Sequence, residues 1–244
     1  MNIVKELRKF RGVLYFYFLG YVYRDLVPLS ATSVRVFTLI ALLLLVGGLG
    51  MLQHILLGAI VALMFGAGLS QLSVDINGLR ITKFKDLLVS SPLNPLTYAL
   101  GSALGMSIVT LLHVAPLLAI FIVLNELNII QVISIIVILA LIWVIGVLLG
   151  FLISLEVRSQ IRLMAVTDVV YSMLVYIMPV YYPITVLPEH VRPLTLISPP
   201  VNAVQAVKLI VDGGVENALA HIAILMVMIL ALTIMVLYRS KWRE

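Results

Sequence analysis

The feature that most constrains this chain is a series of six apolar runs, each long enough to cross a membrane as a helix. A crossing of the ~30 Å hydrocarbon core takes about 20 apolar residues, and an α-helix satisfies its own backbone hydrogen bonds there. Hydrophobic residues make up 63% of the 244 residues and charged residues 11%, against about 45–50% and about 25% in soluble domains. We therefore predict an all-α integral membrane protein with a single transmembrane domain over residues 1–244. Its six transmembrane helices fall within residues 34–74 (spans 1 and 2), 98–155 (spans 3 and 4), 163–182 (span 5) and 219–238 (span 6).

Charge distribution predicts how these spans are oriented. Six spans place both termini on one side, and that side carries 14 of the 16 Lys and Arg residues but 7 of the 11 acidic residues. Because basic residues accumulate on the cytoplasmic side, we expect a multi-pass protein of a prokaryotic cell (plasma) membrane with cytoplasmic N- and C-termini. The net charge of +5 is small and confined to one side, so it gives no indication of a nucleic-acid partner. There is no cysteine, which excludes disulfides and thiolate metal sites.

The N-terminal segment, residues 1–30, does not span the membrane. Its apolar and aromatic residues recur at helical spacing, and Lys5, Arg8 and Lys9 point the other way. This pattern predicts an interfacial amphipathic helix lying along the membrane lipid. The helix is either a simple membrane anchor or one that also contacts a cytoplasmic partner.

The longest cytoplasmic connection is residues 75–97. It contains a short amphipathic segment that Pro92 ends, because the residue before a proline is driven out of the helical region. A helix held here by a partner transmits force to two spans, whereas a segment without a partner is only a solvated loop. The candidate coupling residues are Lys83, Phe84, Lys85, Asp86, Leu87, Leu88, Ser91 and Pro92.

The outer segment, residues 183–217, contains five prolines from Pro183 to Pro200 and is too apolar for a free loop. It is also too short and too broken for a span. We predict a re-entrant outer helical hairpin between spans 5 and 6, where protein or water covers the backbone. Such a hairpin can close an exit path, and the candidate outer-gate residues are Tyr181, Tyr182, Pro183, Leu187 and Pro188.

Two ionisable residues fall inside predicted spans. Asp168 lies about two turns into span 5, and Asp168, Tyr171, Val175 and Met178 recur at spacings that predict one helix face. This face is either a packing seam, with Asp168 directed toward a nearby arginine, or the lining of a pathway at a dimer axis. His113 in span 3 is either a hydrogen-bonded core histidine or part of a proton relay. Two small-residue motifs, residues 101–105 and 146–150, predict close helix contact without chemistry.

The order of these motifs resembles the permease subunit of type-2 ATP-binding cassette (ABC) exporters over nearly the whole chain. In the outer segment, the family pattern appears as Tyr182-Pro183, Leu187-Pro188, the spaced Leu194 and Ile197, and Ser198-Pro199. In the loop after span 2 it appears as Leu87-Leu88, Ser91-Pro92 and Leu93.

The resemblance implies a transporter made of several chains with different roles. It implies an elbow helix at residues 1–25, a coupling helix at about 80–90 that docks on an ATPase subunit, and two short outer helices at about 184–210. It further implies two cytoplasmic ATP-binding cassette ATPase subunits carrying ATP and Mg²⁺, and a second permease copy or paralogue whose spans 1 and 5 meet those of this chain.

Motif absences agree with a chain that is not itself an enzyme. The sequence has no phosphate-binding Gly-x-x-x-x-Gly-Lys-Ser/Thr loop, so any ATP that drives this chain binds elsewhere. We therefore expect a permease that moves a hydrophobic or amphipathic molecule (drug-like, lipid or lipid-linked glycan) or an ion outward. The alternatives are an ion-driven secondary transporter, which predicts repeats and buried ionisable groups, and an intramembrane enzyme, for which only Asp168 and His113 are candidates.

Overall fold

A computed structural model describes residues 3–24, 38, 40–41, 45, 48–81, 95–157 and 159–239. Every regular element in these residues is helical, which confirms the predicted all-α class. In chain order the elements are α1 (Ile3–Arg24), η1 (Leu49–Met51), α3 (Leu52–Ile81), α5 (Pro95–Leu124), α6 (Ile129–Glu156), α7 (Gln160–Tyr171), η2 (Ser172–Ile177), η3 (Ile184–Val186), α8 (Arg192–Thr195), α9 (Pro199–Gly213), η4 (Val215–Ala218) and α10 (Leu219–Arg239).

Within the described residues, four helical stretches are long and apolar enough to cross a membrane. They coincide with predicted spans 2, 4, 5 and 6, while α5 contributes a shorter strongly apolar part at the position of span 3. Most of span 1, predicted within residues 34–52, lies outside the described residues. The six-span topology therefore stays a prediction. The four stretches are Leu52–Ser70, Ile129–Glu156, Gln160–Ile177 and Val215–Arg239.

Two helix ends differ from the sequence prediction. Helix α3 continues to Ile81, seven residues beyond the predicted end of span 2 at residue 74. Span 5 stops at Ile177 rather than at residue 182, because Met178 has an extended backbone and Pro179 has no N–H to continue the helical ladder. Residues 178–182 therefore connect the span to the outer segment instead of belonging to the span.

The core is organised around α3, which packs against α5, α6, α7 and α9. Its closest neighbour is α6, and glycines on both helices allow the two backbones to approach. A Cβ atom added at Gly146 would lie 2.5 Å from the carbonyl oxygen of Phe65 and 3.2 Å from the Cα of Gly68. A Cβ at Gly150 would collide with the carbonyl oxygen of Leu69. The predicted packing role of residues 146–150 is therefore confirmed, in the manner of small-residue contacts between membrane helices.

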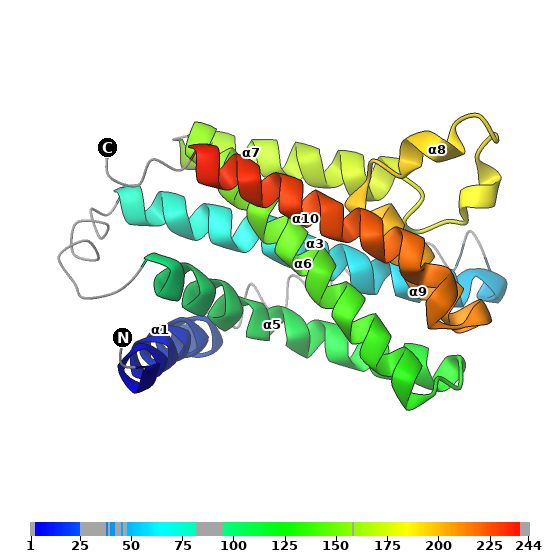
Figure 1. Cartoon of the computed structure of the whole chain (residues 1–244), viewed down its shortest axis with the longest axis horizontal. Coiled ribbons are helices and arrows are strands. Elements are labelled where there is room, and N and C mark those ends of the chain that lie inside the picture. The colour runs from blue at the N-terminus through cyan, green and yellow to red at the C-terminus, as the bar shows by residue number, and fades with distance from the viewer. Residues whose placement is uncertain are drawn as a thin grey trace.

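Helix α1 packs on α5 through the other small-residue motif. A Cβ atom at Gly101 would lie 2.9 Å from the Cγ1 of Val13, so only a glycine allows this approach. Figure 1 shows α1 nearly end-on while the long helices run across the view, so α1 crosses the bundle. Leu7, Tyr15 and Phe16 are exposed on it. The helix itself and its crosswise direction agree with an interfacial helix, whose position at the membrane surface stays a prediction.

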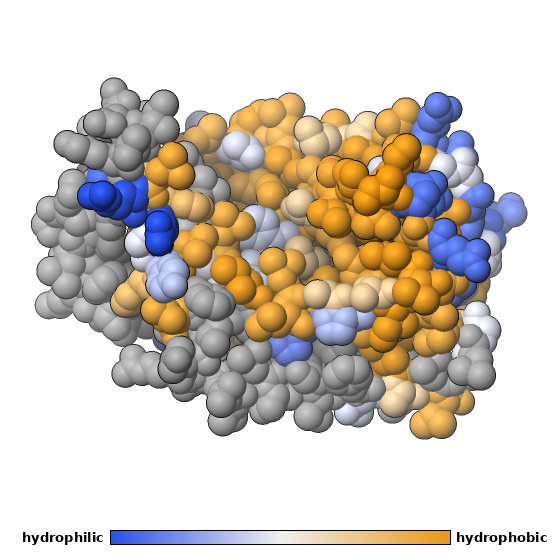
Figure 2. Space-filling view, turned by 90° about the horizontal axis from the view of Figure 1, so that it is seen from below, coloured by the Kyte–Doolittle hydropathy of each residue, from blue (hydrophilic) through white to orange (hydrophobic). Residues whose placement is uncertain are grey.

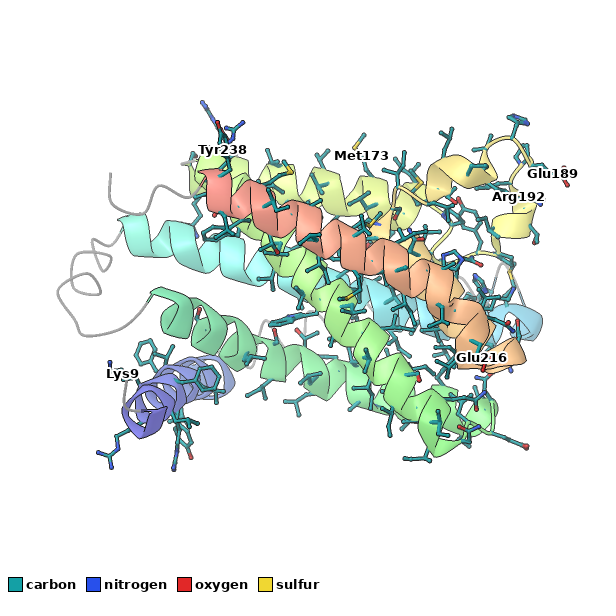
Figure 3. The ribbon with its side chains drawn as sticks, in the orientation of Figure 1. Lys9, Met173, Glu189, Arg192, Glu216 and Tyr238 are labelled. Carbon is teal, nitrogen blue, oxygen red and sulfur yellow. The ribbon has the colours of Figure 1, made fainter. Side chains whose placement is uncertain are left out.

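The bundle has two chemically different ends with an apolar middle. At one end lie α1, the last turns of α3 and α10, and the start of α5; we call it the α1 end (Figure 1). At the other lie η3, α8, the end of α9 and η4; we call it the α8 end. Figure 2 shows hydrophobic residues across the middle and hydrophilic ones toward both ends. Figure 3 places Lys9 and Tyr238 at the α1 end, and Glu189, Arg192 and Glu216 at the α8 end.

Candidate functional site

The predicted coupling residues, Lys83 to Pro92, lie outside the described residues. The structure describes the two helices on either side of these residues. Helix α3 ends at Ile81 and α5 begins at Pro95, both at the α1 end (Figure 1). Of the elbow-helix residues, Lys5 lies on α1, Arg8 is exposed on it and Lys9 is half-buried.

At the same end, an ion pair joins α6 to α10. The Nη1 atom of Arg239 lies 2.6 Å from the Oε1 atom of Glu156, and both side chains are more than half exposed. The pair ties together the final turns of two candidate spans. An exposed ion pair of this kind adds little to the free energy of unfolding. It shows that the two helix ends are close together but is not a main source of their stability.

The four residues predicted to form one face of span 5 differ in burial. Asp168 is exposed on α7, whereas Val175 is 0% exposed and lies in the core. A π-helical turn, η2, continues α7 after Tyr171 and changes the angular spacing of the residues in it. Tyr171 and Met178 are half-buried. Whether Asp168 lines a pathway or a dimer contact stays a prediction.

Three tyrosines spaced five residues apart lie in and next to this turn, and the middle one, Tyr176, is exposed. Tyr176 lies between Tyr171 and Tyr181, at ring-centroid distances of 5.4 Å and 6.2 Å respectively. Two glycines of α3, Gly58 and Gly66, make room for Tyr181 and Tyr171. Burial raises the pKa of the Tyr181 hydroxyl, with a smaller contribution from Tyr176, so this group stays protonated near neutral pH. The five-residue spacing brings the three rings together, across the π-helical turn from Tyr171 to Tyr176 and across extended chain from Tyr176 to Tyr181, and sequence reasoning missed it.

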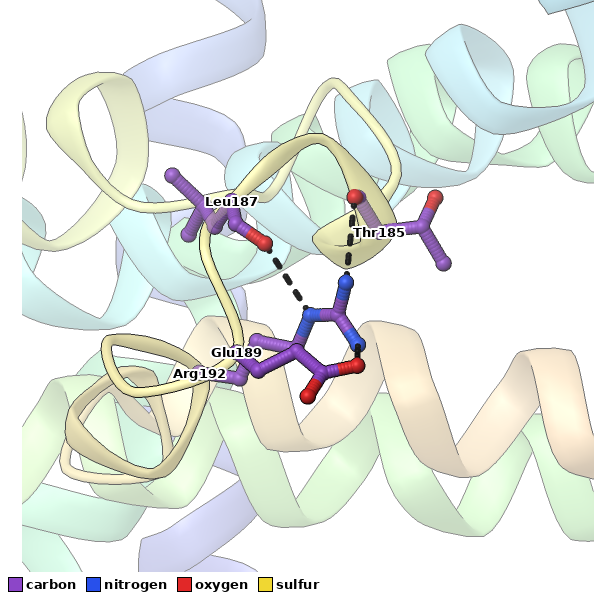
Figure 4. Close-up of polar contacts among 4 residues, drawn as sticks. All are labelled: Thr185, Leu187, Glu189 and Arg192. Carbon is purple, nitrogen blue, oxygen red and sulfur yellow. Dashed lines mark hydrogen bonds and ion pairs between the residues drawn. The ribbon is translucent and has the colours of Figure 1, made fainter.

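Arg192 organises the first part of the outer segment. Its Nε donates to the carbonyl oxygen of Leu187 at 3.1 Å, and its Nη2 donates to that of Thr185 at 3.3 Å (Figure 4). The carboxylate of Glu189 lies 3.9 Å from the third guanidinium nitrogen. The guanidinium has five donors and therefore satisfies carbonyls that a short irregular loop leaves unpaired. Arg192 thus fixes the backbone of Leu187, one of the predicted gate residues.

The other predicted gate residues lie where span 5 becomes the outer segment. The Tyr182 hydroxyl donates to the carbonyl oxygen of Ile177 at 2.9 Å and caps the last turn of the span. Tyr181 is 9% exposed, Pro183 is half-buried and Pro188 is exposed. The structure therefore brings the gate residues together at the α8 end, without testing what they do there.

Helix α9 follows and is largely buried between α3, α6 and α10. It ends at Gly214, whose φ of 95° suits a glycine. The side-chain Nε2 of Gln131, on α6, donates at 2.9 Å to the carbonyl oxygen of Ile210, which also accepts from the N–H of Gly214 at 3.1 Å. The outer segment is therefore anchored in the bundle rather than lying loosely over it.

Polar side chains cross from α9 to both neighbouring spans. The Ser198 hydroxyl donates to the carbonyl oxygen of Leu174 in η2 at 2.9 Å. The Oδ1 of Asn202 pairs with the Nδ1 of His221, on α10, at 3.0 Å. Ser198 and Asn202 are both 0% exposed. Sequence reasoning missed Asn202 and His221, which belong to no recognisable motif, and it noted Ser198 only as part of the Ser198-Pro199 pattern, without its bond to span 5.

A comparison with known families decides what kind of membrane protein this is. The sequence model of a family described as "ABC-2 family transporter protein" matches residues 47–238, which is most of the chain. The chain belongs to the ABC-2 family of transporters. No curated protein matches it.

The family assignment confirms the resemblance seen in the sequence and decides between the three functional classes. As an ABC-2 permease the chain is a multi-pass transport component, and the secondary transporter and the intramembrane enzyme lose their support. ABC-2 membrane domains form a permease family without an ATPase of their own. Within the described residues of this permease, no group of three or more His, Asp or Glu side chains is placed to hold a metal ion.

Proposed function

We propose that this ABC-2 permease exports a hydrophobic or amphipathic substrate (a drug-like molecule, a lipid or a lipid-linked glycan) or an ion, driven by two separate ATPase subunits that bind ATP and Mg²⁺. The observation that carries the proposal is the family match over residues 47–238. The arrangement of the bundle supports it. The helix ends that flank the coupling segment lie at one end of the bundle, and the outer segment lies at the opposite end (Figure 1).

The proposed arrangement in the membrane has six spans, with the α1 end in the cytoplasm and the α8 end outside. The charge asymmetry of the sequence supports this orientation, because 14 of 16 basic residues fall on the terminal side. Residues 183–217 form the re-entrant outer hairpin, and a second permease copy or paralogue completes the transporter. Exposed apolar residues such as Met173 and Val169 on span 5 then face lipid or that second permease (Figure 3).

In the proposed mechanism, ATP binding draws the two ATPases together and moves residues 80–92 of each permease. That movement passes to α3 and α5, which flank the segment. The bundle is packed backbone to backbone where α3 meets α6, so the movement is carried by rigid helices. The exit path then opens at the outer-gate residues, which are Tyr181, Tyr182, Pro183, Leu187 and Pro188.

The test is to reverse the charges of the coupling segment. The triple variant Lys83→Glu, Lys85→Glu, Asp86→Lys and the single variant Pro92→Gly are each co-expressed with a candidate ATP-binding cassette ATPase subunit that co-purifies with the parent permease. We expect normal membrane insertion but at least a tenfold loss of ATPase bound to the purified permease. The matched control exchanges Glu156 and Arg239 at the same end, which keeps their ion pair. Unchanged ATPase binding by both coupling variants would refute the proposal.

A further inference from the structure

The buried amide of Asn202 is hydrogen-bonded through all of its polar atoms. Its Nδ2 donates to the carbonyl oxygens of Leu196 at 2.6 Å and Ser198 at 3.0 Å. Because carbonyl oxygens can only accept, the atom that faces them is the amide nitrogen, and Oδ1 faces His221. Oδ1 accepts from the Nδ1 of His221 at 3.0 Å, which fixes the imidazole with its hydrogen on Nδ1. An amide buried at such a depth is costly unless all of these bonds are made.

Ser198 extends this set of bonds to span 5. In the π-helical turn the carbonyl of Leu174 would find its partner at residue 179, which is a proline without an N–H. The Ser198 hydroxyl takes that place at 2.9 Å. Ser198 thereby binds span 5 through its side chain and Asn202 through its backbone carbonyl.

Together these residues form a continuous polar chain, which we call the outer relay: Leu174 carbonyl, Ser198, Asn202 and His221. It joins three elements, η2 of span 5, α9 and α10 of span 6, and α9 also packs directly against both neighbours. Gln131 holds the far end of α9 to α6. Helices packed only by apolar side chains can slide past each other, whereas directional hydrogen bonds fix their register.

We propose that Ser198, Asn202 and His221 are positioning residues that make the outer end of span 5, α9 and the start of span 6 move as one body when the transporter opens. The inference rests on the proposed ATP-driven function for the cause of the movement. The relay itself is a property of the permease and can be tested without ATP.

The first experiment measures the distance between spin labels at Ile177→Cys and Leu219→Cys. The chain has no cysteine of its own, so only these two sites react. Both positions are exposed, at 66% and 58%, and they flank the relay on spans 5 and 6. With the intact relay we expect one narrow distance distribution, the same with and without bound ATP.

Variants of the relay give the expected contrast. Asn202→Leu and His221→Leu should broaden the distribution at least twofold, and Ser198→Ala should broaden it less. His221→Asn retains a donor at the position of Nδ1 and should restore the narrow distribution. Thr195→Val is the matched control, because the Thr195 hydroxyl is equally buried but bonds only within its own turn, to the carbonyl oxygen of Arg192.

A second experiment separates the relay from the driving force. Single cysteines at Ile177 and Leu219 are labelled with a membrane-impermeant maleimide before and after ATP binding to the complex. Both rates should change together in the parent protein, and in Asn202→Leu only the rate at Ile177 should still respond. If neither labelling rate responds to ATP but the spin-label distances change in the variants as expected, the proposed ATP-driven function is refuted and the outer relay is supported.

Two results would overturn the relay. One is a narrow distribution in both leucine variants and in Ser198→Ala. The other is a parent protein in which the cysteine on span 5 responds to ATP and the cysteine on span 6 does not.

Discussion

The α3–α6 contact and the α8 end are stabilised by different kinds of interaction. Between α3 and α6 the glycines bring backbones into contact, as at Gly146 and Gly150, and this packing resists any change of shape. At the α8 end a few directional bonds from Arg192, Ser198 and Asn202 position irregular chain. In the proposed mechanism the first region suits the transmission of movement, and the second suits a segment whose shape depends on a few bonds.

The largest expected effect comes from filling the glycine contact. Gly150→Ala places a methyl group against the backbone of Leu69, which cannot move aside as a side chain would. We expect the free energy of unfolding to fall by about 2–3 kcal/mol. Thermal unfolding of the purified permease measures this. Gly12→Ala on α1 is the matched control, since nothing lies within 4 Å of its added methyl group; equal melting temperatures for the two variants would contradict the contrast.

The second effect concerns the outer segment. Arg192→Ala removes the donors that hold Thr185 and Leu187, so we expect amide exchange at residues 185–187 to accelerate about tenfold while the core is unchanged. Hydrogen–deuterium exchange measures it. Glu189→Gln should leave exchange nearly unaltered, because its contact with Arg192 is long and its side chain is 91% exposed. Equal acceleration in both variants would show that the ion pair, rather than the two backbone bonds, holds the loop.

A smaller effect is expected where α3 meets the aromatic residues of span 5. A methyl group at Gly66 would lie 2.8 Å from the Cε2 of Tyr171, and a ring can shift more easily than a backbone. We therefore expect Gly66→Ala to cost about 1 kcal/mol, less than Gly150→Ala. Thermal unfolding of Gly66→Ala, Tyr171→Leu and the double variant gives the coupling between the two sites. Strictly additive losses of unfolding free energy in the double variant would mean that the added methyl group and the Tyr171 ring are not in contact.

The smallest effect belongs to the ion pair at the α1 end. Arg239→Gln should lower the free energy of unfolding by about 0.5 kcal/mol at low salt, because both partners are exposed. The difference should disappear as salt screens the charges. Melting curves of the parent protein and the variant at two salt concentrations measure this. A difference that persists at high salt would place the pair in a drier environment than its exposure indicates.

The sequence predicts well those parts of the fold that depend on hydrophobicity averaged over many residues. The helices at spans 2, 4, 5 and 6 follow from long apolar runs, and the contacts at residues 101–105 and 146–150 follow from small-residue spacing. The predicted common face of span 5 stays a prediction, and a count at 3.6 residues per turn does not register the π-helical turn that the structure shows within this span. Arg192 and Asn202 were missed as organisers because their roles depend on which carbonyls tertiary structure leaves open.

The bond from Ser198 to Leu174 also bears on how the chain is made. The two residues are 24 positions apart, and the donor is synthesised after the acceptor. Span 5 is therefore synthesised before the side chain that binds its Leu174 carbonyl, and its last turn gains this hydrogen bond only after Ser198 has been made. The contact between η2 and α9 thus forms later than the span itself.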